Sequence, residues 1–222
     1  MTLPTHSPKS LMRPMDKLII VGAGGHGRET LDIVEAINAV EPQWDFQGFV
    51  DDDVGAFTGL IDRREAKLLG TTEALRSDNS FVIAIGSSTV RAKVDARISM
   101  AGCAARALVH PRATVGPDNQ LGKGVLIAAG AHVTNNVTLA RHVHLNVGAI
   151  VSHDCVVGQY TSLAPGVILN GNVHVGEQVL LGTGAIVTPG VTIGDHAVIG
   201  AGSVVVRDVP AGVTVKGVPG RW

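Results

Sequence analysis

The strongest candidates for acid–base chemistry are a histidine and an aspartate that follow one another, His153 and Asp154. A carboxylate beside an imidazole fixes the tautomer of the ring and raises its basicity, as a general base requires. Eighteen residues further along the chain is Gly171, where no side chain stands in front of the backbone amide. Such an amide could stabilise a developing oxyanion or anchor a thioester carbonyl. A turn that is polar only for reasons of turn geometry is the alternative.

The spacing of 18 matters because the second half of the chain is a repeat. From Val109 to Val205, all seventeen residues taken at intervals of six are Val, Leu or Ile. A second column of mostly smaller residues follows four positions after each of them, with Asn119 as the exception. Gly, Asn and Pro between these points predict short strands joined by tight turns.

Three six-residue units would form one coil, so residues 18 apart lie one strand spacing from each other, roughly 4.8 Å. About five coils fit into the repeat, and their stacking supplies a core that no single coil has. One corner of the stack is then expected to be polar. The residues that meet there are Asn135 and Asn136, His153 and Asp154, and Gly171 and Asn172.

The composition agrees with a narrow, repetitive core. The 222 residues include 28 Gly but only four Phe, two Trp and one Tyr, while hydrophobic residues reach 45%. So much apolar surface excludes disorder for most of the chain, and no apolar run approaches the roughly 18 residues of a membrane span. With 18 basic and 19 acidic residues, a net charge of −1 gives no reason to expect nucleic acid or an anionic membrane as a partner. Two cysteines make neither a disulfide framework nor a four-thiolate metal site.

The first half has a different rhythm, in which short apolar segments alternate with amphipathic ones. The expected strands are 18–21, 46–50 and 81–85, and the expected helices are 28–40 and 89–100. Alternation of this kind predicts a parallel sheet with ligands at the carboxyl ends of its strands. The residues before the first strand include Pro4, Pro8 and Pro14 but no apolar signal-peptide core. We therefore expect a flexible extension and a cytoplasmic protein.

A glycine-rich loop follows the first expected strand. Gly22, Gly24 and Gly27 fit the G-x-G-x-x-G pattern of dinucleotide sites, and acidic residues after the second strand lie where a ribose would be held. About ninety residues are barely half of a full dinucleotide-binding fold, which argues against an NAD-linked dehydrogenase. The loop is instead expected to bind one nucleotide portion, with phosphates near the glycine backbone and the helix N-terminus. A tight turn without a ligand is the alternative.

Nine histidines raise the question of a metal site. His142 and His144 are two residues apart, while His132, His174 and His196 fall on different faces of the expected coils. None of these spacings is typical of zinc ligands. We therefore expect no metal, and we expect most of the histidines to be solvated surface residues.

Four segments together resemble one enzyme family. They are Gly-Ala-Gly-Gly-His-Gly in the loop, Phe-Val-Asp-Asp after the second strand, Ala-Ile-Gly-Ser-Ser with Arg91 after the third strand, and Leu-Asn-Val-Gly-Ala-Ile-Val-Ser-His-Asp-Cys in the repeat. The terminal Gly-Val-Pro-Gly-Arg-Trp adds to the likeness. Over nearly its whole length the chain resembles the bacterial sugar-nucleotide N-acetyltransferases and the related sialic acid O-acetyltransferases, whose repeat forms a left-handed parallel β-helix.

The resemblance implies the fold class and the division of the chain. An α/β Rossmann-like domain precedes an all-β left-handed parallel β-helix. The expected parts are a flexible extension over 1–16, a small nucleotide-sugar-binding domain over 17–107, and the β-helix acetyltransferase domain with a C-terminal cap over 108–222. The resemblance also implies acetyl-CoA as co-substrate and a homotrimer with active sites between neighbouring β-helices.

The resemblance assigns roles to individual residues as well. His153 would take the proton from the substrate amine, Asp154 would support its basicity, and Asn146 would help to place the amine. The residues implied for the coenzyme are Gly171, Thr183, Thr192, Ala201 and Ser162, the last of which stands where some relatives have a second histidine. The residues implied for the nucleotide-sugar are Gly24, Gly25, His26, Asp51, Asp52 and Gly86, with Gly24 in the place of a serine of some relatives.

The leading hypothesis is an acetyl-CoA-dependent N-acetyltransferase that acts on a nucleotide-linked amino sugar by direct attack of the amine on the thioester. An O-acetyltransferase would use the same base on a hydroxyl group. A serine-acetyltransferase-like enzyme is disfavoured because those enzymes usually carry a helical N-terminal domain. A β-helix trimer that only senses a nucleotide, without catalysis, is the alternative from a different class.

Overall fold

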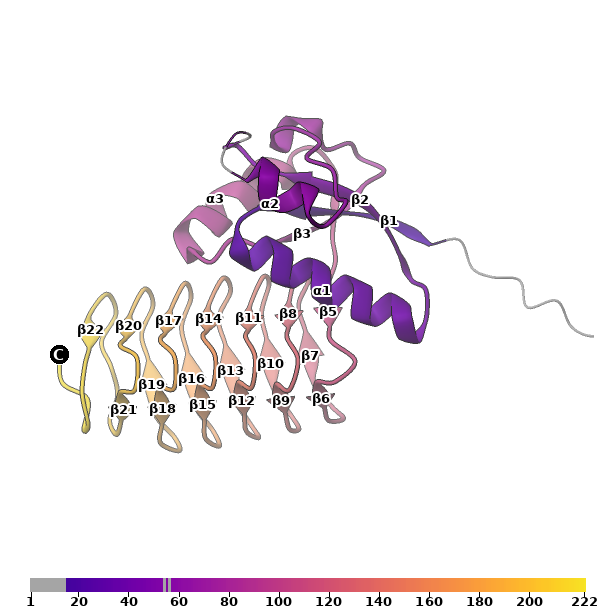
Figure 1. Cartoon of the computed structure of the whole chain (residues 1–222). Helices are drawn as coiled ribbons and strands as arrows, with labels where there is room; N and C mark the ends of the chain where they lie inside the picture. Colours follow the sequence, from indigo (N-terminus) through magenta and orange to yellow (C-terminus); the bar gives the residue numbers. More distant parts are fainter. Residues whose placement is uncertain (1–14, 54, 56) are drawn as a thin grey trace, which may run out of the picture.

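The computed structural model describes residues 15–53, 55 and 57–222. The expected flexible extension therefore lies outside the described residues up to position 14, and the first strand already begins at Asp16. An α/β domain comes first and lies along one side of a parallel β-helix that forms the rest of the chain (Figure 1). The fold class expected from the sequence is confirmed.

Four parallel strands form the sheet of the α/β domain, in the order β2, β1, β3, β4. Their bounds are Asp16–Val21 for β1, Trp44–Val50 for β2, Ser80–Ile83 for β3 and Ala104–Ala105 for β4. The helices are α1 over Gly25–Val40, α2 over Thr58–Asp62 and α3 over Ser88–Ser99, with a 3-10 turn, η1, over Thr72–Ala74. The three expected strands and two expected helices are present with ends within three residues, whereas β4, α2 and η1 were not expected.

Helix α1 lies between this sheet and the β-helix. Its apolar side chains Leu31, Val34 and Ile37 are buried in one cluster with Leu108 and Leu126 of the β-helix. Each fully buried aliphatic side chain of this size stabilises the fold by roughly 1.5–3 kcal/mol. The strip of apolar residues along α1 therefore attaches the α/β domain to the β-helix.

The β-helix consists of three parallel sheets of two-residue strands. The seven-stranded sheet contains β5 Leu108–Val109, β8 Leu126–Ile127, β11 His144–Leu145, β14 Ser162–Leu163, β17 Leu180–Leu181, β20 Val198–Ile199 and β22 Thr214–Val215. The six-stranded sheet contains β6 Thr114–Val115, β9 His132–Val133, β12 Ile150–Val151, β15 Ile168–Leu169, β18 Ile186–Val187 and β21 Val204–Val205. The five-stranded sheet contains β7 Gln120–Leu121, β10 Thr138–Leu139, β13 Val156–Val157, β16 His174–Val175 and β19 Thr192–Ile193. Partners such as His144 and Ser162 are 18 residues apart, which confirms the expected coil length.

The two columns of inward residues fill the β-helix. Large members such as Leu145 and Val151 and small members such as Ala149 and Cys155 are at most 1% exposed and belong to one continuous cluster. A triangular coil is narrow, so aliphatic side chains fill it without aromatic rings. The scarcity of aromatic residues in the composition is explained by this core.

In most coils, each corner of the β-helix contains one residue in the left-handed backbone region. In the corner between the seven- and six-stranded sheets, the glycine corner, these residues are Gly130, Gly148, Gly166, Gly184 and Gly202. In the corner between the six- and five-stranded sheets, the polar corner, they include Asn136, Asp154 and Asn172. In the corner between the five- and seven-stranded sheets, the domain-facing corner, they include His142, Tyr160 and Gln178. A bulky side chain makes this conformation costly, on the order of 1–2 kcal/mol per residue.

Candidate active site

The polar corner holds the histidine and aspartate that the sequence singles out. His153 and Asp154 follow strand β12, and Nδ1 of His153 lies 2.7 Å from Oδ2 of Asp154. Because a carboxylate only accepts, Nδ1 of His153 carries the proton and Nε2 keeps its lone pair. Both side chains are exposed, at 61% and 48%. The geometry therefore offers a basic ring nitrogen to a molecule that approaches the corner from outside.

Residues from the two adjacent coils hold this pair. Nδ2 of Asn136 donates to Oδ1 of Asp154 at 2.6 Å, and the hydrogen bonds from Asn136 and His153 lower the pKa of Asp154. On the other side, a Cβ atom added at Gly171 would lie 2.5 Å from Cε1 and 2.6 Å from Nε2 of His153. The amide nitrogen of Gly171 donates to no backbone carbonyl within the described ranges. The ring of His153 therefore lies against Gly171, with no side chain between them, as the spacing of 18 predicts.

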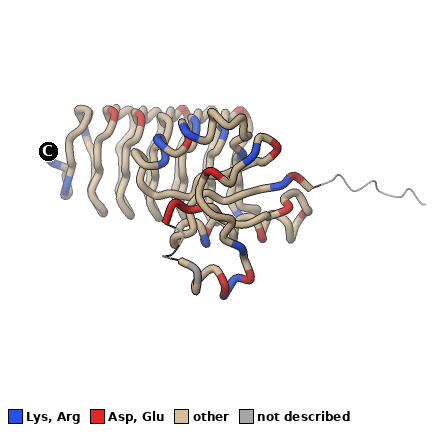
Figure 2. Tube along the Cα trace, turned by 90° about the horizontal axis from the view of Figure 1, so that it is seen from above, with Lys and Arg blue, Asp and Glu red and all other residues tan. Residues whose placement is uncertain are grey.

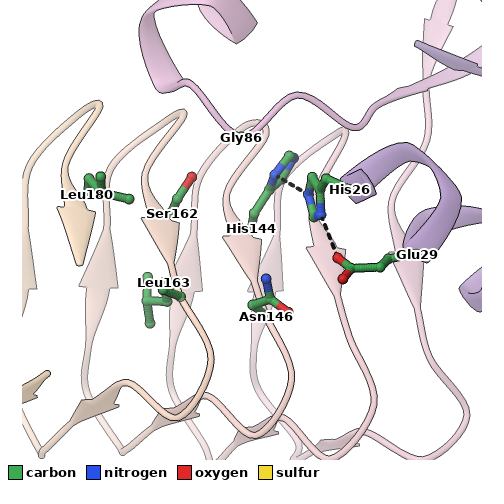
Figure 3. Close-up of a pocket in the computed structure, with 9 residues that line it drawn as sticks. His26, Glu29, Gly86, His144, Asn146, Ser162, Leu163 and Leu180 are labelled. Carbon is green, nitrogen blue, oxygen red and sulfur yellow. Dashed lines mark hydrogen bonds and ion pairs between the residues drawn. The ribbon is translucent and has the colours of Figure 1, made fainter. Parts of the chain in front are cut away.

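A second concentration of polar side chains lies beneath the α/β domain, in a cavity of about 220 Å³ (Figure 3). His26 and Glu29 reach it from the beginning of α1, and Gly86 reaches it from the loop after β3. The β-helix contributes the residues His144, Asn146, Ser162, Leu163, Ala164 and Leu180. The amide oxygen of Asn146 accepts from the backbone N–H of Val147 at 2.7 Å, which leaves its amide nitrogen available to a ligand.

A chain of three side chains crosses one wall of this cavity. Nδ1 of His26 lies 3.5 Å from Oε2 of Glu29, and Nε2 of His26 lies 3.1 Å from Nδ1 of His144. Burial lowers the pKa of His26 and lowers that of His144 well below its ordinary value. The buried cation Arg91 lowers both further. Both imidazoles are therefore neutral at physiological pH.

Arg91 of the α/β domain supports the cavity without lining it. Its guanidinium donates to the carbonyl oxygens of Ile85 and Gly86 at 2.6 and 3.2 Å and to Oγ of Ser162 at 2.8 Å. The side chain is fully buried, and burial lowers its pKa to about 10. Because Gly86 and Ser162 come from different domains, Arg91 fixes the distance between two walls of the cavity.

A buried ionic cluster attaches the α/β domain to the domain-facing corner. Asp95 of α3 accepts from Nε of Arg141 and from the hydroxyl of Tyr160, each at 2.6 Å, and lies 3.0 Å from Nε2 of His142. Burial alone would raise the pKa of Asp95, but hydrogen bonds from these three groups hold it well below its ordinary range. The ring of His142 stacks on those of Tyr160 and Phe81, with centroid distances of 5.7 and 6.1 Å.

The residues expected to bind the nucleotide-sugar divide into two groups. His26 and Gly86 line the cavity. Asp51 instead accepts from the backbone N–H of Ala23 at 2.8 Å, and Asp52 pairs with Arg97 at 2.6 Å. These carboxylates already support the glycine loop and the neighbouring helix. Gly24 and Gly25, at the N-terminus of α1, do not line this cavity.

The residues expected to bind the coenzyme lie on different sides of the β-helix. Thr183 and Ala201 lie at the glycine corner, Ser162 begins β14 in the seven-stranded sheet, and Thr192 begins β19 in the five-stranded sheet. Gly171 lies at the polar corner beside His153. A molecule that contacts all of them cannot lie along one face of one chain.

The two polar concentrations are not brought together within one chain. The chain passes in turn through the seven-, six- and five-stranded sheets, so the polar corner is the one corner that the seven-stranded sheet does not touch. The α/β domain contacts the seven-stranded sheet and the domain-facing corner, through His26, Arg91 and Asp95. His153 and the cavity therefore lie on opposite sides of the triangular prism.

The expectation of mostly solvated histidines is wrong for the coil that carries the cavity. His142 and His144 are 0% and 4% exposed because the α/β domain covers them. No group of three or more His, Cys, Asp or Glu that could hold a metal ion occurs among residues 15–53, 55 and 57–222. Over the same ranges, each helix is too short or too polar to cross a membrane.

Sequence reasoning missed two polar residues of the cavity, Glu29 and His144, and it gave Arg91 no role of its own. Glu29 follows His26 by three positions, which places the two side chains on the same face of a helix. His144 occupies an outward column whose other members include Leu108, Leu126 and Leu180. Leu108 and Leu126 are buried and mark the covered part of this column, whereas Leu180 is 42% exposed, and the histidine that follows the two buried leucines signals a buried polar contact.

Charged side chains of both signs occur in both domains, more densely in the α/β domain than in the β-helix, and neither sign gathers in one place (Figure 2). The cavity and the polar corner are therefore distinguished by their contacts rather than by a surrounding field. Recognition at either place depends on short-range hydrogen bonds.

Comparison with known proteins identifies both parts of the chain. Residues 17–98 match the model of the PglD N-terminal domain, and residues 172–207 match the bacterial transferase hexapeptide (six repeats). A curated UDP-N-acetylbacillosamine N-acetyltransferase of Bacillus subtilis (strain 168) is 33% identical over 117 residues. That match spans 52% of this chain and 52% of the relative, so about half of the curated relative's length is covered.

Solved structures match over nearly the whole length. The acetyltransferase domain of PglB from Neisseria gonorrhoeae FA1090 is 31% identical with a TM-score of 0.82, over 93% of this chain and 98% of that one. PerB from Caulobacter crescentus, solved in complex with CoA and GDP-perosamine, is 33% identical with a TM-score of 0.82, over 92% of this chain and 96% of that one. The Neisseria domain has also been solved in complex with acetyl coenzyme A.

Proposed function

Because this chain belongs to the bacterial sugar-nucleotide N-acetyltransferase family of hexapeptide-repeat proteins, we propose that it transfers the acetyl group of acetyl-CoA to the amino group of a nucleotide-linked amino sugar. The observation that carries the proposal is the pair His153 and Asp154, whose Nδ1 and Oδ2 atoms are 2.7 Å apart and whose imidazole lies against Gly171 with no side chain between them. That arrangement combines a base with a free lone pair and a donor for a carbonyl oxygen. The resemblance to PerB, solved with CoA and GDP-perosamine, supports the choice of substrates.

The proposed reaction is a direct attack. The lone pair of the sugar amine adds to the carbonyl carbon of the thioester, and the new C–N bond forms as the carbonyl becomes an oxyanion. The proton of the amine passes to Nε2 of His153, while Nδ1 remains bound to Asp154. The C–S bond then breaks, the oxyanion collapses to an amide, and the thiolate of CoA takes the proton from His153. The amide of Gly171 would stabilise the carbonyl oxygen.

The proposed active site is formed by two copies of the chain. His153 lies on the side of the β-helix away from the cavity, so the cavity of one copy would receive the sugar and the polar corner of a neighbour would supply the base. In a trimer, three such sites would form between adjacent β-helices. Thr183 and Thr192, which lie on different sides of one chain, would then reach the coenzyme from different copies.

A free-thiol assay tests the proposal. UDP-, GDP- and dTDP-linked amino sugars are offered with acetyl-CoA, and mass spectrometry of the product distinguishes an N-acetyl from an O-acetyl group. We expect one nucleotide-linked amino sugar to release thiol stoichiometrically with an N-acetyl product, and H153A to abolish release while acetyl-CoA still binds. Thiol release by H153A at near the wild-type rate, or an O-acetyl product, would overturn the proposal.

A further inference from the structure

His144 occupies an unusual place for an ionisable group. It begins β11, in register with Leu126 of the preceding coil and Ser162 of the following one, and points out of the β-helix toward the α/β domain. It is only 4% exposed, and Nε2 has no hydrogen-bond partner within the described part of the chain. A buried imidazole costs stability unless a specific contact offsets it. A contact with the α/β domain supplies such an offset.

That contact is to His26, from the other domain. Nε2 of His26 lies 3.1 Å from Nδ1 of His144, and the two ring centroids are 5.1 Å apart with the planes tilted by 49°. Figure 3 shows the two rings meeting at the wall of the cavity, with Glu29 on the far side of His26. The contact joins residues 118 positions apart in the sequence.

The acceptor at one end of this chain sets the direction of its hydrogen bonds. A carboxylate accepts but does not donate, so Nδ1 of His26, which faces Glu29, carries a proton. In a neutral His26 ring, Nε2 then has a lone pair and must accept from Nδ1–H of His144. In that arrangement Nε2 of a neutral His144 ring is left with a lone pair.

The charged groups around the pair also favour two neutral rings. Arg91 of α3 lies behind both histidines, His142 flanks His144 on the β-helix, and Glu29 is on α1. Burial and the cation of Arg91 oppose a positive charge on either ring, while Glu29 favours one at His26 and the backbone carbonyl of Ile83 favours one, to a smaller extent, at His144.

We propose that His144 is a positioning residue, which donates from Nδ1 to His26 and thereby holds His26 with its Nδ1–H directed to Glu29. His26 and Glu29 together then present a fixed donor and acceptor to the sugar in the cavity. The identity of that sugar rests on the function proposed above, whereas the tautomer of His26 does not. Without the donor at position 144, the His26 ring would rotate or exchange tautomers, and the sugar would lose a prearranged partner.

The chain offers a matched control in the same coil. His142 is as buried as His144 but contacts Asp95 and the ring of Tyr160, not the cavity. H144F removes the donor from position 144 and keeps a planar ring, and H142F makes the same replacement at the control position. H144N is the rescue variant, because an asparagine amide nitrogen can occupy the position of Nδ1.

The kinetic arm uses the amino-sugar nucleotide that the thiol-release panel identifies. We expect H144F to raise the KM for that substrate about tenfold, as for the loss of one hydrogen bond, with kcat and the KM for acetyl-CoA within about twofold of wild type. H144N should recover most of the lost affinity. H142F should lower Tm yet leave the sugar KM unchanged. Equal effects of H144F and H142F on the sugar KM would overturn the proposal.

The second arm needs no substrate and separates this inference from the proposed function. Long-range ¹H–¹⁵N NMR of the histidine side chains in the free full-length protein reports which nitrogen of His26 is protonated. We expect Nδ1–H in the wild type and in H144N, and a mixture with Nε2–H in H144F. Nε2–H in the wild type, or no change in H144F, refutes the positioning role even if every amino sugar in the panel is acetylated. If none is acetylated, the tautomer readout still decides.

Discussion

Replacing Gly171 by alanine tests the polar corner directly. The new Cβ atom would lie 2.5 Å from Cε1 and 2.6 Å from Nε2 of His153, whereas an ordinary contact begins at 3.4 Å. The backbone at Gly171 is not in the left-handed region, so alanine introduces no dihedral strain there. The substitution therefore acts on the ring of His153 and not on the fold.

The magnitude follows from how far the ring must move. A displacement of about 0.9 Å is enough to clear Cε1, and a misplacement on the order of 1 Å can cost about 100-fold in rate. The same movement lengthens the 2.7 Å hydrogen bond to Asp154. We therefore expect kcat/KM of G171A to fall about 100-fold, while Tm changes by no more than about 3 °C.

The assay is thiol release from acetyl-CoA with the accepted amino sugar, with thermal unfolding measured on the same preparation. G59A is the control, because a Cβ atom at Gly59 would meet nothing within 4 Å and the residue lies in the short helix α2, away from both polar concentrations. G59A should match wild type in rate. Wild-type activity in G171A, or a loss of activity explained entirely by unfolding, would refute the argument that the bare amide and the ring need this space.

Three further predictions concern charge and pH. D154N should lower kcat about 10- to 100-fold, because the imidazolium loses its carboxylate, with little change in the KM for acetyl-CoA. Steady-state kinetics measure both constants, and a rise in KM larger than the fall in kcat would contradict this role of Asp154. D95N leaves buried partners uncompensated and should destabilise the fold by about 3 kcal/mol in urea unfolding. Because the pKa of Asp95 is held well below its ordinary 3.8, the wild type should also lose stability as pH falls below about 4, and D95N should lose less. Burial lowers the pKa of His142 and His144 from 6.5, so the unfolded chain binds more protons than the folded one at mildly acidic pH. Tm should therefore decline between about pH 7 and pH 5, and it should decline less in H144F, which a thermal-shift series would show.

Contacts that follow from the repeat could be predicted from the sequence. The six-residue repeat determines which side chains point inward, and the 18-residue coil predicts that Gly171 lies over His153, as the structure has it. Stacked identical coils leave little freedom, so spacing alone determines neighbours. The same regularity explains why the core residues of the β-helix were expected and found.

Contacts between the domains could not be predicted in this way. The pairing of His26 with His144 depends on which face of the β-helix the α/β domain covers, and the six-residue repeat has the same pattern on all three faces. The burial of Arg91 against Ser162 has the same origin, across 71 positions of sequence. Periodicity describes one domain at a time, whereas docking is determined by side chains that break the periodicity.

The stack of His142 on Tyr160 has a consequence for how the two domains find their alignment. A solenoid repeats its surface about every 4.8 Å, so a domain docking on it would meet nearly equivalent positions one coil up or down. At the domain-facing corner the left-handed residues are Gly124, His142, Tyr160, Gln178 and His196 in successive coils. Among the described residues, rings on two successive coils of this corner occur at His142 and Tyr160 alone, and Phe81 stacks on the first of them. This pair of rings therefore distinguishes one docking position of the α/β domain from the positions one coil above or below it. It also places His26 at the coil that carries His153.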